Sequence, residues 1–202
     1  MSARRTYLDY NATAPLRPQA REAMLAAFDS AGNASSVHAE GRAARARVEA
    51  ARGSIAKLVS AQAAEVVFTS GATEAANWVL SQSWDVVLAS AVEHPCVAGP
   101  VARSPGRVVT LDVDANGRVD LQRIEAALAR EAADTSGRSR RLLIVQLANN
   151  ETGVVQPIAD IAKLARAHGV RLLVDAVQGA GRLPFDDWAK LVDYLLITSH
   201  KI

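Results

Sequence analysis

The sequence predicts an α/β fold built around a mostly parallel sheet with flanking helices. Three observations support this prediction. From residue 65 onward, short apolar segments alternate with segments of helical periodicity. Several of the apolar segments contain no polar residue, as is typical of strands that are covered on both faces. The chain has 202 residues, of which 50% are hydrophobic, so it can bury a sizeable core.

Two helices are expected before this alternation begins. The first starts near Pro18, because proline suits the first turn of a helix. The second extends from about 38 to 59, where apolar residues recur at helical spacing and most arginines fall elsewhere. Gly53 lies inside it and weakens it by about 1 kcal/mol relative to alanine. The glycine-, asparagine- and serine-rich segment 32–36 separates the two helices.

The alternation that follows defines the remaining elements in order. Strands are expected at 66–69, 86–89, 108–111, 142–147, 171–174 and 194–197, and helices after Gly71, after Pro95, at 120–130 and at 158–167. The polar stretch 134–141 is interpreted as an exposed loop, because the alternation resumes directly after it. We therefore expect residues 1–202 to form a single domain.

The composition excludes several classes of function. The net charge is only +2 and the arginines are scattered, which gives no basic surface for nucleic acid. No apolar run approaches the roughly 18 residues of a membrane span, and the first residues lack the apolar core of a signal peptide. The single cysteine, Cys96, cannot form an internal disulfide and fits a reducing compartment. We expect a cytoplasmic protein without membrane contacts, whose partners are small molecules or proteins.

The segment TSGATE at 69–74 is the first candidate binding element. A strand that turns through a small residue into a helix presents unpaired backbone N–H groups and the positive end of the helix dipole, and such turns bind phosphate. The hydroxyl of Thr73 could add one hydrogen bond. An ordinary capped helix is the alternative, and a P-loop is excluded because no Gly-Lys-Ser/Thr follows at the required spacing.

A carboxylate and an amine also follow apolar strands. Asp175 ends one of them, where a charge is costly unless it meets a cation or hydrogen-bond donors. Its alternative role is to cap the next turn. Of the four lysines, only Lys201 directly follows an apolar strand. A partly dehydrated lysine has a lowered pKa and can form Schiff bases, whereas the alternative is a lysine that marks the solvent end of a strand.

Two further candidates come after strands of the predicted sheet. His94 could lie flat against an aromatic ligand or cap the helix that begins at Pro95. Asn150 belongs to a run that could form an ordinary asparagine-rich turn. In a parallel sheet the ends of these strands converge on one edge. A phosphorylated aromatic aldehyde with a basic ring nitrogen would use all of these groups, so the predicted cofactor is pyridoxal phosphate.

Seven segments together carry a resemblance to a known family. They are YLDYNATAP at 7–15, GNASSVHAEG at 32–41, FTSGATEAAN at 68–77, EHP at 93–95, NNETG at 149–153, VDAVQ at 174–178 and SHK at 199–201. In this order they resemble the class V aminotransferase family of pyridoxal-phosphate enzymes and, within it, the cysteine desulfurases. The resemblance implies the large, cofactor-binding domain of the fold type I pyridoxal-phosphate transferases.

The resemblance also implies a role for each candidate residue. Lys201 would hold the cofactor as a Schiff base and move the Cα proton of the substrate, and His94 would stack on the cofactor ring. Asp175 would keep the pyridine nitrogen protonated. Gln178 and Asn150 would bind near the phenolic oxygen. The phosphate would be held by Ala72, Thr73, Thr198 and His200, with no metal in the site. Ser199 is also counted among the cofactor-binding residues, although its side chain could crowd the phosphate.

Some positions depart from the family pattern. Ala34 stands where the family usually has proline, Thr198 where it has serine, and Ser199 where it has glycine or alanine. In the family, the lysine lies about midway along the chain, and the small C-terminal domain and the loop with the nucleophilic cysteine follow it. The resemblance therefore implies a truncated, N-terminal half. Cys96 is expected to be a small buried helix residue rather than that nucleophile.

The implied activity is that of a cysteine desulfurase, which converts L-cysteine to L-alanine and transfers the sulfur as an enzyme persulfide for iron–sulfur cluster assembly or related sulfur delivery. The implied partners are a sulfur-acceptor or scaffold protein and a second copy, since the full-length parent would be a homodimer. We expect the isolated 202 residues to be inactive. The alternatives are a related class V lyase or aminotransferase, such as a selenocysteine lyase, and a non-catalytic remnant that associates with a partner subunit.

Overall fold

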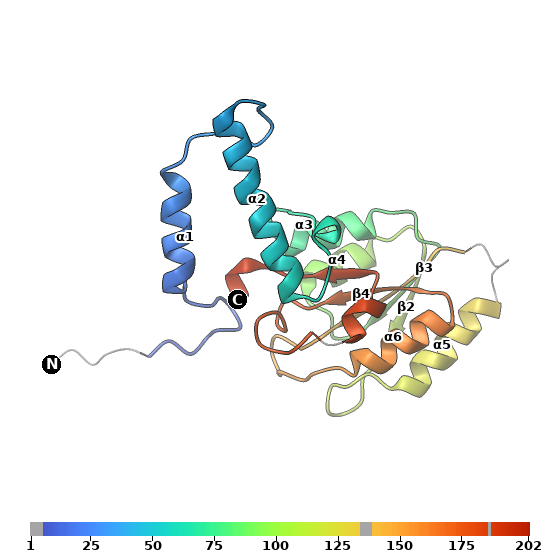
Figure 1. Cartoon of the computed structure of the whole chain (residues 1–202). Coiled ribbons are helices and arrows are strands. Elements are labelled where there is room, and N and C mark those ends of the chain that lie inside the picture. Colours follow the sequence, from blue (N-terminus) through green and yellow to red (C-terminus); the bar gives the residue numbers. More distant parts are fainter. Residues whose placement is uncertain (1–5, 134–138, 186) are drawn as a thin grey trace. The chain divides into compact units, whose positions relative to one another are not determined.

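The computed structural model describes residues 6–133, 139–185 and 187–202. The chain divides between Val67 and Phe68 into two compact units (Figure 1). The sequence-based prediction that residues 1–202 form one domain stays a prediction. Within the described parts of the chain, every helix is too short or too polar to cross a membrane.

Among its described residues, the first unit contains two helices and a short 3-10 turn. They are α1 (Pro18–Phe28), α2 (Ala39–Leu58) and η1 (Ala63–Glu65), which confirms both predicted helices. Pro18 occupies the first turn of α1, as the sequence indicates. His38 caps α2, and its Nδ1 accepts the N–H of Gly41 at 3.4 Å. The guanidinium of Arg47 donates to the carbonyl oxygen of Ala26 at 3.3 Å and so joins the two helices.

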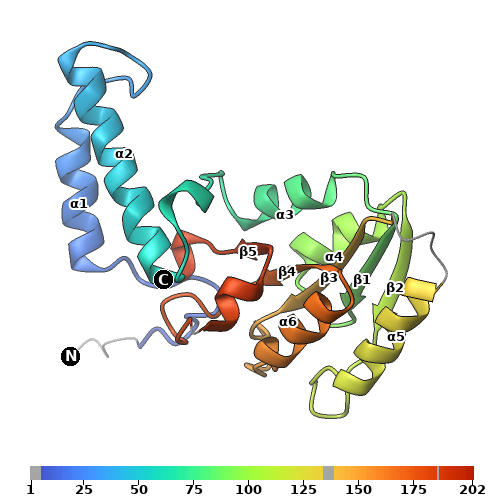
Figure 2. The same ribbon diagram turned by 45° about the vertical axis from the view of Figure 1, so that its right-hand side comes forward.

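The second unit is a parallel sheet with helices on both faces. Its strands lie in the order β2-β1-β3-β4-β5, and all are parallel. Figures 1 and 2 show α3 and α4 on one face of this sheet and α5 and α6 on the other. The strands are β1 (Val86–Ser90), β2 (Arg107–Leu111), β3 (Arg141–Gln146), β4 (Arg171–Asp175) and β5 (Tyr194–Leu196). The helices are α3 (Ala72–Leu80), α4 (Pro95–Ala102), α5 (Leu121–Ala133) and α6 (Ile158–Ala167), with 3-10 turns η2 (Asp187–Leu191) and η3 (Ser199–Lys201).

Apolar side chains alternate between two cores along the central strands. In β1 and β3, Leu88 and Leu143 face the core formed with α5 and α6. Their neighbours Val87 and Ile144 face the core formed with α3 and α4. All four are fully buried. This two-sided burial explains why the strands appear in the sequence as continuous apolar runs.

The strand order places a crevice at one edge of the sheet. From β1 the chain moves outward to β2, and it then returns to build β3, β4 and β5 on the other side of β1. In open α/β sheets, ligands bind beyond the carboxyl ends of the strands, next to the position where the order reverses. The turns after β1, β3, β4 and β5 all open toward this edge.

One predicted strand is wrong. Residues 66–69 form no strand in the described structure, although the backbone of Val66 is extended. The side chains of Val67 and Phe68 are 60% and 46% exposed. These two apolar side chains are therefore not buried in the sheet. The other predicted strands and the predicted helices are confirmed, and each end that was predicted agrees to within three residues. Of the predicted loop 134–141, residues 134–138 lie outside the described residues.

Candidate cofactor site

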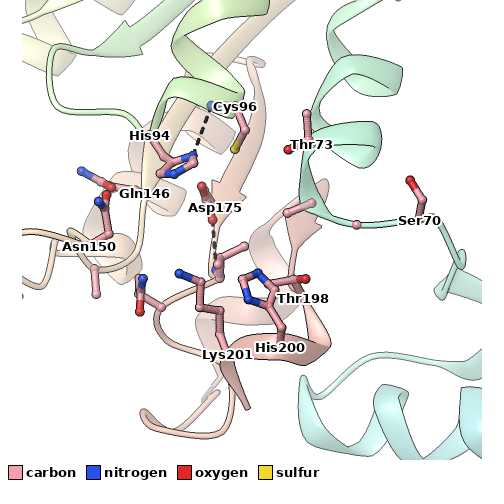
Figure 3. Close-up of a pocket in the computed structure, with 15 residues that line it drawn as sticks. Ser70, Thr73, His94, Cys96, Gln146, Asn150, Asp175, Thr198, His200 and Lys201 are labelled. Atoms are coloured by element: carbon pink, nitrogen blue, oxygen red, sulfur yellow. Dashed lines mark hydrogen bonds between the residues drawn. The ribbon is translucent and has the colours of Figure 1, made fainter. Parts of the chain in front are cut away.

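A cavity of about 260 Å³ lies at the carboxyl edge of the sheet. This volume is just below the roughly 300–1,000 Å³ that is typical of pockets for drug-sized ligands, and it suits a ligand with one small ring. Figure 3 shows the side chains that surround it. The lining residues are Ser70, Gly71, Ala72, Thr73, His94, Cys96, Gln146, Ala148, Asn150, Asp175, Val177, Gln178, Thr198, His200 and Lys201.

Asp175 supplies a buried carboxylate at the end of β4. Its Oδ1 accepts the N–H of Val177 at 3.0 Å, so the residue does cap the following turn. Burial raises the pKa of Asp175, and the bond from Val177 and the nearby His94 and Lys201 only partly oppose this effect. A cation placed against this carboxylate would favour its ionised form. The capping and ligand-binding interpretations are therefore compatible.

Lys201 supplies the amine of the cavity. It is the last residue of η3, which follows β5, and its side chain reaches into the cavity on the side of Asp175 (Figure 3). Of the four lysines in the chain, only Lys201 lines the cavity. By contrast, the ammonium of Lys163 pairs with Asp160 on the exposed surface of α6, at 2.9 Å.

His94 lies across the cavity from Lys201 (Figure 3). It is the N-cap of α4, and its Nδ1 accepts the N–H of Cys96 at 3.1 Å. This bond fixes the orientation of the imidazole while the ring lines the cavity. The two roles considered for His94, a helix cap and a ring against a ligand, therefore occur in one geometry.

The N-terminus of α3 forms another wall. The first N–H groups of a helix have no intrahelical partner, and Ala72 and Thr73 occupy this position beside the cavity. A side chain built on Gly71 would meet nothing within 4 Å, so a ligand can approach the backbone here. Glu74 turns back to accept the N–H of Ser70 at 2.6 Å. Hydrogen bonds from the side chain and then the backbone of Ser70 lower the pKa of Glu74. The N-terminus of α3 thus offers the positive end of the helix dipole, and there is room beside it for an anionic group.

The remaining predicted residues surround the same cavity, with one exception. Asn150, Gln178, Thr198 and His200 all line it. Asn150 also donates to its neighbour Glu151 at 2.6 Å, within the expected asparagine-rich turn. Ser199 is exposed and does not line the cavity, because it begins the 3-10 turn η3 and its carbonyl oxygen accepts the N–H of Ile202.

Cys96 lines the cavity, although the sequence was interpreted as burying it in α4. It is only half-buried. Desolvation, helped by the charges of Asp175 and Glu93, raises the pKa of Cys96 to about 11. The thiol is therefore protonated at neutral pH, which makes it a weak nucleophile.

Sequence reasoning missed Gln146 and the buried acid behind it. Gln146 is the last residue of β3, and its side-chain amide donates to the carbonyl oxygen of Val92 at 2.5 Å. Its backbone N–H donates to Oε1 of Glu93 at 2.8 Å, and Ser90 donates to the same oxygen at 2.5 Å. Burial raises the pKa of Glu93 to about 7. Gln146 could have been identified from the sequence, because it is a polar residue at the end of an apolar strand.

The chain is similar to proteins of known family. Residues 6–202 match the family model described as aminotransferase class V. Cysteine desulfurase IscS of Anaeromyxobacter sp. (strain K) is 40% identical over an alignment of 208 residues, which covers 97% of this chain and 50% of that protein. The chain thus spans about half the length of the curated relatives that it matches.

Solved structures show the same similarity in three dimensions. A NifS-like protein from Rickettsia africae ESF-5 superposes with a TM-score of 0.87 and 32% identity, over 97% of this chain and 54% of that one. A structure described as SspA in complex with cysteine gives a TM-score of 0.84 and 29% identity, over 97% and 57% of the two chains. These similarities confirm the predicted fold, with a parallel sheet and flanking helices.

Proposed function

Because this chain belongs to the class V aminotransferase family, whose members are pyridoxal-phosphate enzymes, we propose that its cavity binds pyridoxal phosphate and that these residues form the cofactor-binding half of a cysteine desulfurase. The observation that carries the proposal is the meeting of Lys201, Asp175 and the N-terminus of α3 in one cavity. Each supplies a different group that the cofactor requires.

The residues present fit this cofactor. Asp175 is a buried acid whose pKa is raised by burial, and a protonated ring nitrogen would supply the cation that favours its ionised form. The N-terminal turn of α3, with open space at Gly71, suits a phosphate group. Lys201 is the amine that can form a covalent bond with an aldehyde.

Bound pyridoxal phosphate supplies an electron-accepting ring that stabilises negative charge at the Cα of an amino acid. In the proposed mechanism, Lys201 holds the cofactor and then moves the Cα proton with its Nζ. Asp175 keeps a proton on the ring nitrogen, so that the ring remains electron-accepting. His94 lies against the ring and excludes water from that face.

The polar residues of the cavity orient the cofactor in this proposal. Gln178 and Asn150 bind near its phenolic oxygen. The phosphate is held by Ala72 and Thr73 on α3 together with Thr198 and His200 after β5. Ser199 was predicted to bind the cofactor without an assigned group, and its exposed position outside the cavity lining leaves that role a prediction.

We further propose L-cysteine as the substrate and L-alanine as a product, with the sulfur passing as an enzyme persulfide to a sulfur-acceptor or scaffold protein for iron–sulfur cluster assembly. The names of the similar proteins, and the similar structure described as a complex with cysteine, support this substrate. A cytoplasmic homodimer is the assembly that we propose. The protonated thiol of Cys96 makes it an unsuitable persulfide carrier.

Because the isolated 202 residues are expected to be inactive, the test measures the alanine that the complete cysteine desulfurase, of which these residues are proposed to form the cofactor-binding half, releases from L-cysteine in the presence of pyridoxal phosphate. We expect Lys201→Ala to abolish release and the matched surface variant Lys163→Ala to leave it unchanged. Equal release by Lys201→Ala and the unaltered protein would contradict the proposal. Faster turnover of L-selenocysteine, with little alanine from L-cysteine, would instead support a selenocysteine lyase.

A further inference from the structure

We propose that Arg182 is a positioning residue that fixes the side-chain amide of Gln178 and couples it to the main chain of Lys201. The inference rests on the proposed function, because Gln178 and Lys201 belong to the proposed cofactor site. It goes beyond that function, because Arg182 does not line the cavity and has no role in the account above.

The guanidinium of Arg182 contacts two separate parts of the site. One terminal nitrogen donates to Oε1 of Gln178 at 2.8 Å. The other donates to the carbonyl oxygen of Lys201 at 3.1 Å. Gln178 is buried, whereas Arg182 is exposed, so the guanidinium reaches the site from the solvent side. One cation therefore joins the turn after β4 to the turn after β5.

The first of these bonds determines which way the amide of Gln178 faces. A guanidinium has donors and no acceptor, so the atom of Gln178 that faces Arg182 is the carbonyl oxygen. The NH₂ group consequently points away from Arg182, and Gln178 offers the cavity a donor rather than an acceptor. A donor is the group that an anionic phenolic oxygen of pyridoxal phosphate requires.

Close packing holds the two turns in place around this contact. Gly181 has a φ of +73°, and a Cβ there would lie 2.9 Å from Cγ2 of Ile202, beside Lys201. A Cβ at Gly179 would lie 2.2 Å from Cδ2 of Leu147. The backbone around Gln178 and Arg182 is thus closely packed, and this packing holds both residues in place while the guanidinium of Arg182 contacts Oε1 of Gln178.

The first test needs no cofactor. In Arg182→Met, which keeps an unbranched apolar side chain but removes the donors, we expect the side-chain amide NMR signals of Gln178 to move and its amide hydrogens to exchange severalfold faster. Arg182→Lys should restore part of the effect. The matched control is Arg123→Met, since Arg123 is an exposed arginine of α5 that lies 3.7 Å from Asp120. Unchanged Gln178 signals in Arg182→Met would overturn the inference.

The second test measures the pH midpoint of the visible absorption change of bound pyridoxal phosphate. A fixed donor favours the anionic phenolic oxygen, so Arg182→Met should raise the midpoint by about half to one pH unit, as expected for one hydrogen bond. Gln178→Glu retains an oxygen that accepts from Arg182 but has no NH₂ group to donate to the phenolic oxygen. It should therefore raise the pH midpoint as well. An unchanged midpoint in both variants would overturn the inference.

The two tests separate this inference from the proposed function. The other ionisable groups of the cavity are His94, Cys96, Asp175, His200 and Lys201. They are unchanged in Arg182→Met, whereas Gln178→Glu adds a carboxylate, so Arg182→Met is the variant whose shift reports on the Gln178 amide. Arg182→Lys keeps the positive charge and so separates the loss of the guanidinium donors from the loss of charge. If the unaltered protein binds no pyridoxal phosphate, the proposed function fails. The amide signals of the cofactor-free protein then decide the inference alone.

Discussion

The two compact units differ sharply in how they use their apolar residues. Among the described residues of the first unit, only Ala56 and Val59 are buried apolar side chains, and α1 buries none of its residues. In the second unit, every residue of β1 is buried between two hydrophobic cores. Both units nevertheless contain helices of clear sequence periodicity. The comparison teaches that a periodic pattern predicts a helix without showing what covers its apolar face.

Exposed apolar side chains are concentrated in the first unit. The large ones there are Tyr7, Leu8, Tyr10, Leu16, Met24, Leu25, Phe28, Val37, Val48, Leu58 and Val67, whereas the second unit has Phe68, Trp78, Val108 and Val155. Since the cavity also lies within the second unit, stability and cofactor binding should both depend far more on residues 68–202.

The largest contrast is expected for the charge at the end of β4. Asp175→Ala should weaken the affinity for pyridoxal phosphate by about a hundredfold or more, because removing one partner of a buried charge pair costs about 3–5 kcal/mol. The measurement is an absorbance titration with the cofactor. The matched variant in the first unit is Glu49→Ala, which removes an acid that lies 3.0 Å from Arg52. Equal affinities of the two variants would contradict a role of Asp175 at the ring nitrogen.

The next contrast concerns the core. Leu143 is fully buried, and Leu143→Ala should lower the free energy of unfolding by about 2–5 kcal/mol through lost contacts and the remaining cavity. Leu25 in α1 is 45% exposed, and Leu25→Ala should change the free energy of unfolding by about 0.5 kcal/mol or less. Urea unfolding measures both. A loss of similar size in Leu25→Ala would show that the face of α1 is covered in solution.

The pH dependence of stability should reside in the second unit as well. The folded pKa of Glu93 is about 7 and its ordinary value is 4.5, so between these values the folded state keeps a proton that the unfolded state loses. The stabilisation is complete below about pH 4.5 and is lost as the pH rises through 7, by an amount on the order of 3 kcal/mol.

Glu93→Gln mimics the protonated acid and should remove this loss. Urea unfolding at a series of pH values would show its curve separating from that of the unaltered protein between pH 4.5 and 7. The exposed Glu22 of α1 provides the control, since Glu22→Gln makes the same change in composition within the first unit. Parallel curves for Glu93→Gln and the unaltered protein would contradict the raised pKa.

The smallest expected effect lies within α2. Gly53 has nothing within 4 Å of the position of a Cβ, so Gly53→Ala should stabilise the helix by about 0.5–1 kcal/mol. Gly41 in the same helix would place its Cβ 2.3 Å from the carbonyl oxygen of Ser36, so Gly41→Ala should destabilise it. Thermal melting followed by circular dichroism compares the two variants. Destabilisation by Gly53→Ala would indicate packing against this face.

The bounds of an element could be predicted from the sequence where its apolar positions are the ones that the fold buries. Helix α6 has the predicted bounds 158–167, because Ile158, Ile161 and Ala165 all face one core. The strand predicted at 66–69 failed because apolar composition does not reveal whether a neighbouring strand is present to pair with. Pairing is a tertiary property, and a short apolar run contains no information about it.

The same distinction applies to the candidate site. Residues that follow strands, such as Asp175 and Lys201, could be assigned to one edge of the sheet, because parallel strands bring their carboxyl ends together. Ser199 was included with its neighbours in sequence, and its exposed side chain at the start of η3 leaves that inclusion a prediction. The contacts of Glu93 and Arg182 could not be anticipated, since each depends on side chains that only the fold brings near.

The central claim is that Lys201 holds pyridoxal phosphate in this cavity. Its most direct test is to incubate the purified protein with pyridoxal phosphate, reduce it with borohydride and locate the added mass by peptide mapping. The account predicts selective labelling of Lys201. Absence of label, or label spread over Lys57, Lys163 and Lys190, would contradict it.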